Sequence, residues 1–199
     1  MDITNAIKDG NDLKSKIPAE YFAKLTGGLG SPKVWHTLNN LCAQSDTYLE
    51  VGTYMGASLM AALYGNKVDA FAIDNFCMKS YTRPHFFQNV KGLDFTFIEK
   101  DCFKVELSEI TKPIELYFFD GEHSEDSQYK ALAHFLPIMK KEFVYVCDDW
   151  TNTPVRKGTL NAIKDFNLTV KEVEIRGVGK LKDVSGWWCG IAIFKLVKP

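Results

Sequence analysis

Short apolar runs alternate with helix-like stretches along the chain from residue 46 onward. The apolar runs have the length and composition of strands, and they cover residues 47–51, 68–73, 95–98, 114–119 and 143–147. The spacing of apolar residues between and after these runs predicts helices over residues 57–64, 124–139 and 155–166. This alternation is typical of an α/β domain with a largely parallel sheet and helices on both faces.

The two ends of the chain depart from this alternation. Residues 168–175 and 188–196 are strand-like, and no helical pattern lies between them. We expect these two strands to pair antiparallel, because a parallel return would need a long crossover, usually a helix. The chain is therefore predicted to hold an N-terminal helical segment, residues 1–45, packed on a single α/β domain, residues 46–199.

Composition and charge narrow the class of protein. The 199 residues are 46% hydrophobic and 25% charged, which suits a folded domain and excludes a disordered chain. The net charge of −1 gives no bulk attraction to nucleic acid or to an anionic membrane. The five cysteines are widely spread with no C-x-x-C pair, which argues against a disulfide framework or a zinc knuckle. No apolar run approaches about 18 residues and the N-terminus lacks a signal-peptide core, so we expect a soluble, cytoplasmic protein.

Carboxylates follow all five of the strands predicted to be parallel. The strand-end residues are, in chain order, Glu50, Gly52, Tyr54, Gly56 and Ser58, then Asp74 and Asn75, Asp101 and Cys102, Asp120 and His123, and Asp148, Asp149 and Trp150. Ligands of open α/β sheets bind beyond the carboxyl ends of the strands. These positions are therefore the first candidates for a functional site.

The glycine turn after the first strand does not match a dinucleotide fingerprint. The pattern G-x-G-x-x-G would need glycines where this chain has Tyr54 and Ala57, and a tyrosine there blocks the approach of a pyrophosphate. The remaining pair, Gly52 and Gly56, forms either a turn that suits a small anionic group or simply a tight turn with close helix packing. Asp74 is likewise either a carboxylate that binds ribose hydroxyls or a turn former.

An acidic cluster follows the fourth and fifth strands. If these strands are neighbours, Asp120 and Asp148 end side by side, with Asp149 next along the chain. Three carboxylates that stay ionised together usually hold a cation, and all-oxygen ligands favour Mg²⁺, with Mn²⁺ and Ca²⁺ as alternatives. The other interpretation is that Asp148 and Asp149 cap the next segment. His123 is a candidate general base, because its ordinary pKa suits proton removal at neutral pH, or else a solvated loop histidine.

These motifs resemble those of class I S-adenosylmethionine-dependent methyltransferases, in particular catechol-type small-molecule O-methyltransferases and their bacterial relatives. The resemblance covers residues 46–196, and it implies the family's Rossmann-like, seven-stranded, mostly parallel sheet with an antiparallel last strand. It also implies S-adenosylmethionine as the cofactor. The residues that match cofactor-binding positions are Glu50, Gly52, Tyr54, Gly56, Ser58, Asp74, Asn75, Asp101, Cys102 and Asp120.

The resemblance also implies roles at the acidic cluster. Asp120, Asp148 and Asp149 fall on the three metal-ligand positions of the catechol-type enzymes, although the third ligand there is commonly asparagine. The catalytic lysine of those enzymes falls on His123, which makes His123, with Asp120, the candidate catalytic group. When such a cation binds two vicinal oxygens of an acceptor, it lowers the pKa of one hydroxyl.

Tryptophans are candidates for the walls of an acceptor site, because a flat aromatic substrate suits them. We assign this role to Trp150 and Trp187, which lie in predicted loops, and expect Trp35 and Trp188 to pack in the core.

The predicted function is O-methylation of a small-molecule hydroxyl. The alternatives are a nucleotide-dependent oxidoreductase and a relative of the same fold that binds a metabolite or partner without catalysis. Residues 1–45 are expected to lie near the substrate site. This segment is short for a lid over a substrate, which favours the relative that binds without catalysis. The expected partner is a small-molecule acceptor, with neither nucleic acid nor membrane, and a homodimer is left open.

Overall fold

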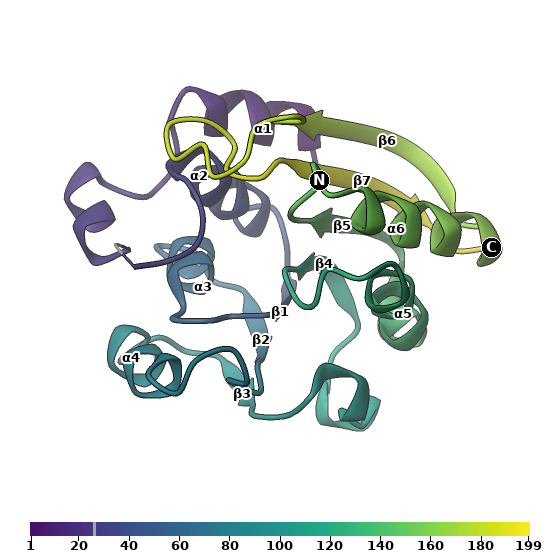
Figure 1. The fold of residues 1–199 in the computed structure, drawn as a ribbon, viewed down its shortest axis with the longest axis horizontal. Coiled ribbons are helices and arrows are strands. Elements are labelled where there is room, and N and C mark those ends of the chain that lie inside the picture. Colours follow the sequence, from purple (N-terminus) through teal and green to yellow (C-terminus); the bar gives the residue numbers. More distant parts are fainter. Residues whose placement is uncertain (26) are drawn as a thin grey trace.

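A seven-stranded sheet runs through the centre of the molecule (Figure 1). The computed structural model describes residues 1–25 and 27–199. The strands are β1 (Thr47–Val51), β2 (Asp69–Ile73), β3 (Thr96–Ile98), β4 (Ile114–Phe119), β5 (Met139–Cys147), β6 (Thr169–Arg176) and β7 (Ile191–Val197). Their order across the sheet is β3-β2-β1-β4-β5-β7-β6. The strands β1 to β5 are parallel, whereas β7 runs antiparallel to both of its neighbours, which confirms the predicted fold class.

Helices cover both faces of this sheet. They are α1 (Ile3–Asn11), α2 (Pro32–Cys42), α3 (Ala57–Leu63), α4 (Thr82–Asn89), α5 (Glu125–Phe135) and α6 (Thr153–Asp165), with short 3-10 helices at Ala19–Lys24, Cys102–Lys104, Leu107–Glu109 and Leu136–Ile138. Apolar residues of α1 to α4 form one buried cluster, and those of α5 and α6 form a second on the opposite face (Figure 1). The central strands β1 and β4 are buried on both faces, which is why they are almost continuously apolar.

The strand order reverses at β1, between β2 and β4. Residue pairs such as Val51 and Ile73, and Phe119 and Cys147, are in register, so the strands β1, β2, β4 and β5 end at the same edge. A crevice at such a switch point is where open α/β sheets bind ligands. The fold therefore gathers the predicted strand-end residues at one place.

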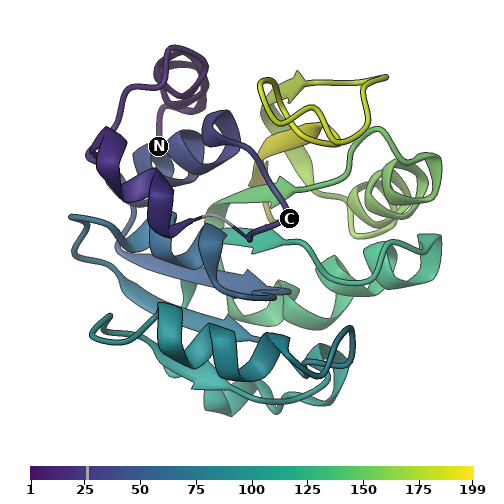
Figure 2. The ribbon, with the colours of Figure 1, turned by 60° about the vertical axis from the view of Figure 1, so that its left-hand side comes forward.

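The N-terminal segment packs against the sheet and reaches the loop between β6 and β7. Ile3 and Ile7 of α1 and Leu38 of α2 are fully buried. The hydroxyl of Ser31, at the start of α2, donates a 2.7 Å hydrogen bond to the carbonyl of Gly186 in the β6–β7 loop. Figure 2 shows these two parts of the chain, in purple and yellow, at the same end of the molecule.

Some elements differ from the predicted ones. The helix α4 was not predicted, because within it Thr82 and Phe86 alone are buried and they leave no clear apolar stripe. The strand β7 begins at Ile191 rather than at Trp188, since Trp188 and Gly190 have left-handed backbones with φ of 56° and 83°. The strand β5 begins four residues before the predicted start, at Met139.

No helix among residues 1–25 and 27–199 combines the length and the apolar character needed to cross a membrane.

Candidate active site

A cavity of about 920 Å³ opens at the carboxyl ends of the strands, where the strand order reverses. Its wall includes the glycine turn after β1, the residues that follow β2, β3 and β4, and Asp149 after β5. The N-terminal segment contributes Gly28 and Leu29, and the β6–β7 loop contributes Lys182, Trp188 and Cys189. One cavity thus joins most of the predicted cofactor residues with part of the acidic cluster.

The turn after β1 brings its backbone close to the end of β4. Gly52 has a φ of 89°, and a Cβ atom there would lie 2.0 Å from the carbonyl oxygen of Asp120. Its own N–H donates to the carbonyl of Ile73 at 2.9 Å. Glycine is required at this position both for its backbone conformation and for the close approach.

Asp74 holds the turn in place from the end of β2. One carboxylate oxygen accepts from the backbone N–H of Tyr54 at 2.7 Å and the other from that of Phe76 at 2.6 Å. The hydroxyl of Thr53 donates a longer bond of 3.3 Å. A carboxylate has about four lone-pair positions, so Asp74 keeps acceptor capacity for a ligand. The neighbouring Asn75 also lines the cavity.

Asp101 and Cys102 line the cavity at the end of β3. Asp101 caps the short helix that follows, because its side chain accepts from the backbone N–H of Phe103 at 3.1 Å. Burial raises the pKa of the Cys102 thiol to about 12, so the thiol is neutral.

Glu50 lies under the cavity rather than in its wall. Its side chain is fully buried and accepts hydrogen bonds of 2.6 Å from the hydroxyls of Tyr48 and Ser58. Burial raises its pKa to about 8. Of these two candidate cofactor residues, Ser58 lines the cavity and Glu50 supports it from beneath.

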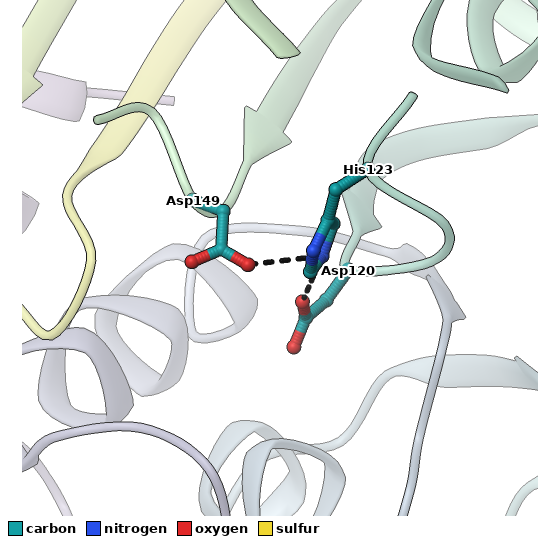
Figure 3. Close-up of side chains that lie close together, drawn as sticks. All are labelled: Asp120, His123 and Asp149. Carbon is teal, nitrogen blue, oxygen red and sulfur yellow. Dashed lines mark ion pairs between the residues drawn. The ribbon is translucent and has the colours of Figure 1, made fainter. Parts of the chain in front are cut away.

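Asp120, His123 and Asp149 converge at the ends of β4 and β5 (Figure 3). The Nε2 atom of His123 lies 2.9 Å from Oδ2 of Asp149 and 3.5 Å from Oδ1 of Asp120. One ligand atom from each of the three residues lies within 4.8 Å of the others. The structure therefore brings together a histidine and two carboxylates that are separated in the sequence.

Charge and burial shift the pKa values of this group. Contacts with Asp120, and then with Asp149, raise the pKa of His123 to about 10, so its ring is protonated at neutral pH. Burial raises the pKa of Asp120 to about 6, against the opposing effect of His123. Burial also acts to raise the pKa of Asp149, but the contact with His123 outweighs it and the pKa is lowered.

Asp148 lies beside this group without joining it. Its side chain is 3% exposed, and its Oδ1 atom has no hydrogen-bond partner among the described residues. Burial and then the charge of Asp120 raise its pKa strongly. Asp120 and Asp148 follow the paired residues Phe119 and Cys147, as expected, but the group with converging ligand atoms consists of Asp120, Asp149 and His123.

The tryptophan that lines the cavity is not one of the two that were predicted to do so. Trp150 is 3% exposed and packs against Phe194 with ring centroids 5.4 Å apart, and Trp187 is 8% exposed. Neither lines the cavity, whereas Trp188, which was expected in the core, does. The physical reason is the left-handed backbone of Trp188, which interrupts the strand alternation on which that expectation depended.

Sequence reasoning missed Leu29, Lys182 and Cys189 as wall residues. They belong to the N-terminal segment and the β6–β7 loop, not to the segments that follow the parallel strands in the sequence, and no periodicity or motif points to them.

Comparison with known protein families identifies the class of this chain. A family model described as a methyltransferase domain matches residues 49–150, just over half of the 199 residues. The chain belongs to the methyltransferase domain family. This membership confirms the predicted methyltransferase and decides against the alternative of a nucleotide-dependent oxidoreductase. A comparison with curated protein sequences gave no match.

Solved structures share the fold of this methyltransferase at low sequence identity. An O-methyltransferase from Bacillus cereus in complex with SAH (S-adenosylhomocysteine) is 12% identical, with a TM-score of 0.58, over 98% of this chain and 90% of that one. The SAH-bound methyltransferase PaMTH1 of Podospora anserina is 14% identical, with a TM-score of 0.66, over 98% of this chain and 95% of that one. These likenesses show that the fold extends over nearly the whole chain.

Proposed function

We propose that this methyltransferase moves the methyl group of S-adenosylmethionine to a hydroxyl oxygen of a small molecule, with a divalent cation at the acidic cluster. The observation that carries the proposal is the single cavity that joins the glycine turn and Asp74 to Asp120, His123 and Asp149. An acceptor beside that cluster and a cofactor at the turn would share one space, as direct transfer requires. Both solved structures described above contain SAH.

The residues around the turn fit the cofactor. Because Gly52 has no side chain, the turn packs directly against the carbonyl of Asp120 at the end of β4, and Gly52 itself lines the cavity. Asp74 keeps one acceptor position for a ribose hydroxyl and gains a second where a ribose hydroxyl replaces the long bond from Thr53. Asp101 lines the same wall farther along the sheet edge. The bound cofactor would supply an electrophilic methyl group on a sulfonium, and Asp120 is the carboxylate that we place beside that positive charge.

The residues of the cluster also fit a cation. Two carboxylates and an imidazole have ligand atoms within 4.8 Å of one another. The nearby Asp148 has a buried oxygen that finds no hydrogen-bond partner within residues 1–25 and 27–199. Because one of the donors is an imidazole nitrogen, this set favours Mn²⁺ or another first-row transition metal more than the all-oxygen set of the sequence prediction did. The cation would act as a Lewis acid on the acceptor hydroxyl.

His123 has two candidate roles at this cluster, as a metal ligand or as the base that accepts the hydroxyl proton. Its present ion pairs keep the ring protonated, and a protonated imidazole can neither bind a metal nor accept a proton. Either role therefore requires that a bound group take over the carboxylates of Asp120 and Asp149. Those carboxylates otherwise orient the ring toward the ends of β4 and β5.

The metal part of the proposal is tested by comparing Asp149→Asn with Asp148→Asn. Transfer of labelled methyl to a vicinal aromatic diol is measured after EDTA treatment and after readdition of Mn²⁺ or Mg²⁺. We expect EDTA to abolish transfer and Mn²⁺ to restore it, and Asp149→Asn to need more metal than Asp148→Asn. Cofactor affinity should stay within a few-fold in both variants, because Asp74 and Gly52 lie on other strands. Full activity of the wild type in EDTA would contradict the metal role.

We propose a cytoplasmic location for this activity. All five cysteines are free thiols, and three of them are buried. A reducing compartment keeps such thiols free.

A further inference from the structure

The β6–β7 loop forms the wall of the cavity next to Asp120, His123 and Asp149, which we call the acid–histidine cluster. A chain of contacts runs from His123 to Asp149 at 2.9 Å, from Asp149 to the thiol of Cys189, and from the sulfur of Cys189 to the backbone N–H of Lys182 at 3.5 Å. Lys182 and Trp188 of this loop both line the cavity. They therefore stand beside the cluster, at the end of the cavity away from Asp74 and Asp101.

Backbone contacts fix the course of the loop around Lys182 and Trp188. Lys182 and Trp188 have φ of 54° and 56°, a conformation that costs free energy for residues other than glycine. Trp188 also exchanges two backbone hydrogen bonds with Asp183, of 3.0 and 3.1 Å, which close the loop on itself. The loop is further tied to the start of α2 by the bond from Ser31 to Gly186.

Lys182 is the lysine of the cavity wall that pairs with no carboxylate in the described part of the chain. The other lysines of the wall are paired within the chain, Lys100 with Glu109 at 2.8 Å and Lys130 with Asp126 at 2.6 Å. Each carboxylate of the wall likewise has a hydrogen bond or ion pair from the chain itself. In the described part of the chain, Lys182 has no ion pair, and its backbone N–H makes the contact to Cys189. An ammonium group that no carboxylate of the chain engages can form a charge-assisted pair with an anionic ligand group.

From this arrangement we infer that the acceptor is a small aromatic hydroxyl compound that carries an anionic group, such as a carboxylate. Its ring lies against the half-buried indole of Trp188, its carboxylate pairs with the ammonium group of Lys182, and its hydroxyl faces Asp120, His123 and Asp149. The inference rests on the proposed function and adds the charge of the substrate to it. Lys182 and Trp188 are then residues that determine substrate specificity.

Two matched diols test the inference by binding, without turnover. The dissociation constants of 3,4-dihydroxybenzoate and of its neutral analogue 3,4-dihydroxybenzamide are measured by calorimetry on the SAH-loaded protein. We expect the benzoate to bind about tenfold more tightly than the benzamide, as one charge-assisted contact allows. Lys182→Met should remove this preference by weakening the benzoate alone, and Trp188→Ala should weaken both compounds.

Lys180→Met is the matched control, because Lys180 lies in the same loop, pairs with Asp183 at 3.6 Å and does not line the cavity. It should keep the full preference, and all three variants should bind SAH as the wild type does. Equal binding of the two diols, binding of neither, or a preference that survives in Lys182→Met would overturn the inference. If the benzoate binds selectively through Lys182 but no methyl is transferred to it, the proposed reaction fails while the inference about charge stands.

Discussion

At the scale of single residues, Asp74 has two tasks in the proposed site. It accepts backbone hydrogen bonds from Tyr54 and Phe76, and it offers its remaining acceptor positions to the ribose of the cofactor. We expect Asp74→Ala to weaken S-adenosylmethionine binding by about 1.5–3 kcal/mol, roughly ten- to hundredfold. Calorimetric titration measures this loss. Unchanged affinity would show that the cofactor does not bind at the end of β2.

Circular dichroism melting separates the two tasks of Asp74. The alanine variant also loses the bonds that hold the turn, so its melting temperature without cofactor should fall. Asp74→Asn keeps one carbonyl oxygen as an acceptor and should melt closer to the wild type, while still binding the cofactor less well.

The buried carboxyl of Glu50 should make stability depend on pH. Its pKa is about 8 in the folded protein against an ordinary 4.5, mainly because of burial. The unfolded chain therefore releases this proton near pH 4.5, whereas the folded protein keeps it up to about pH 8. As the pH rises through that window, the folded state loses stability relative to the unfolded state, by on the order of a few kcal/mol.

Glu50→Gln tests this pH dependence, because the amide keeps the shape of the side chain and cannot ionise. The free energy of unfolding is measured by urea denaturation at pH 5 and at pH 8, without cofactor. Its decrease from pH 5 to pH 8 should be larger in the wild type than in the variant. The same change with pH in both proteins would show that Glu50 does not titrate in this window.

At the scale of elements, the close approach of β1 and β4 depends on Gly52. Gly92 has nearly the same φ, 87° against 89°, but a Cβ atom there would meet nothing within 4 Å. Alanine at either position costs about 1–2 kcal/mol for the left-handed backbone. At Gly52 it also clashes with the carbonyl of Asp120, which adds about 1–3 kcal/mol. The free energy of unfolding from chemical denaturation should therefore be clearly lower for Gly52→Ala than for Gly92→Ala. Equal losses of stability in the two variants would contradict the close approach.

The strands were predictable from the sequence because their apolar runs reflect burial on both faces. The runs of β1 and β4 match the predicted ranges, 47–51 and 114–119. The helix α4 left no such signal, since little of it is buried. The nearness of Asp120 to Asp148 and Asp149 was predictable because β4 and β5 are adjacent in a parallel sheet. Which of the two aspartates joins Asp120 and His123 was not predictable from that adjacency. The position of Trp188 was not, because it depends on a backbone conformation that strand periodicity does not encode.

At the scale of the whole molecule, the cavity is assembled from segments at opposite ends of the sequence. It is lined by the glycine turn and the strand ends, by the N-terminal segment, and by the β6–β7 loop, whose Cys189 contacts Asp149 of the acid–histidine cluster. The bond from Ser31 to Gly186 links the N-terminal segment to this loop directly. Cofactor binding should therefore depend on the central sheet, and acceptor choice on the two ends of the chain.

The most direct measurement is the fate of a ¹³C-labelled methyl group. The protein is incubated with S-adenosylmethionine labelled in that methyl, 3,4-dihydroxybenzoate and Mn²⁺, and the products are followed by NMR. If the protein methylates the hydroxyl oxygen, a new methoxy signal appears on the aromatic compound in an amount equal to the SAH formed. This methoxy signal should be absent with Asp120→Ala. A label that stays on the cofactor, or that is found on carbon or nitrogen rather than on oxygen, would contradict the proposed methylation of oxygen.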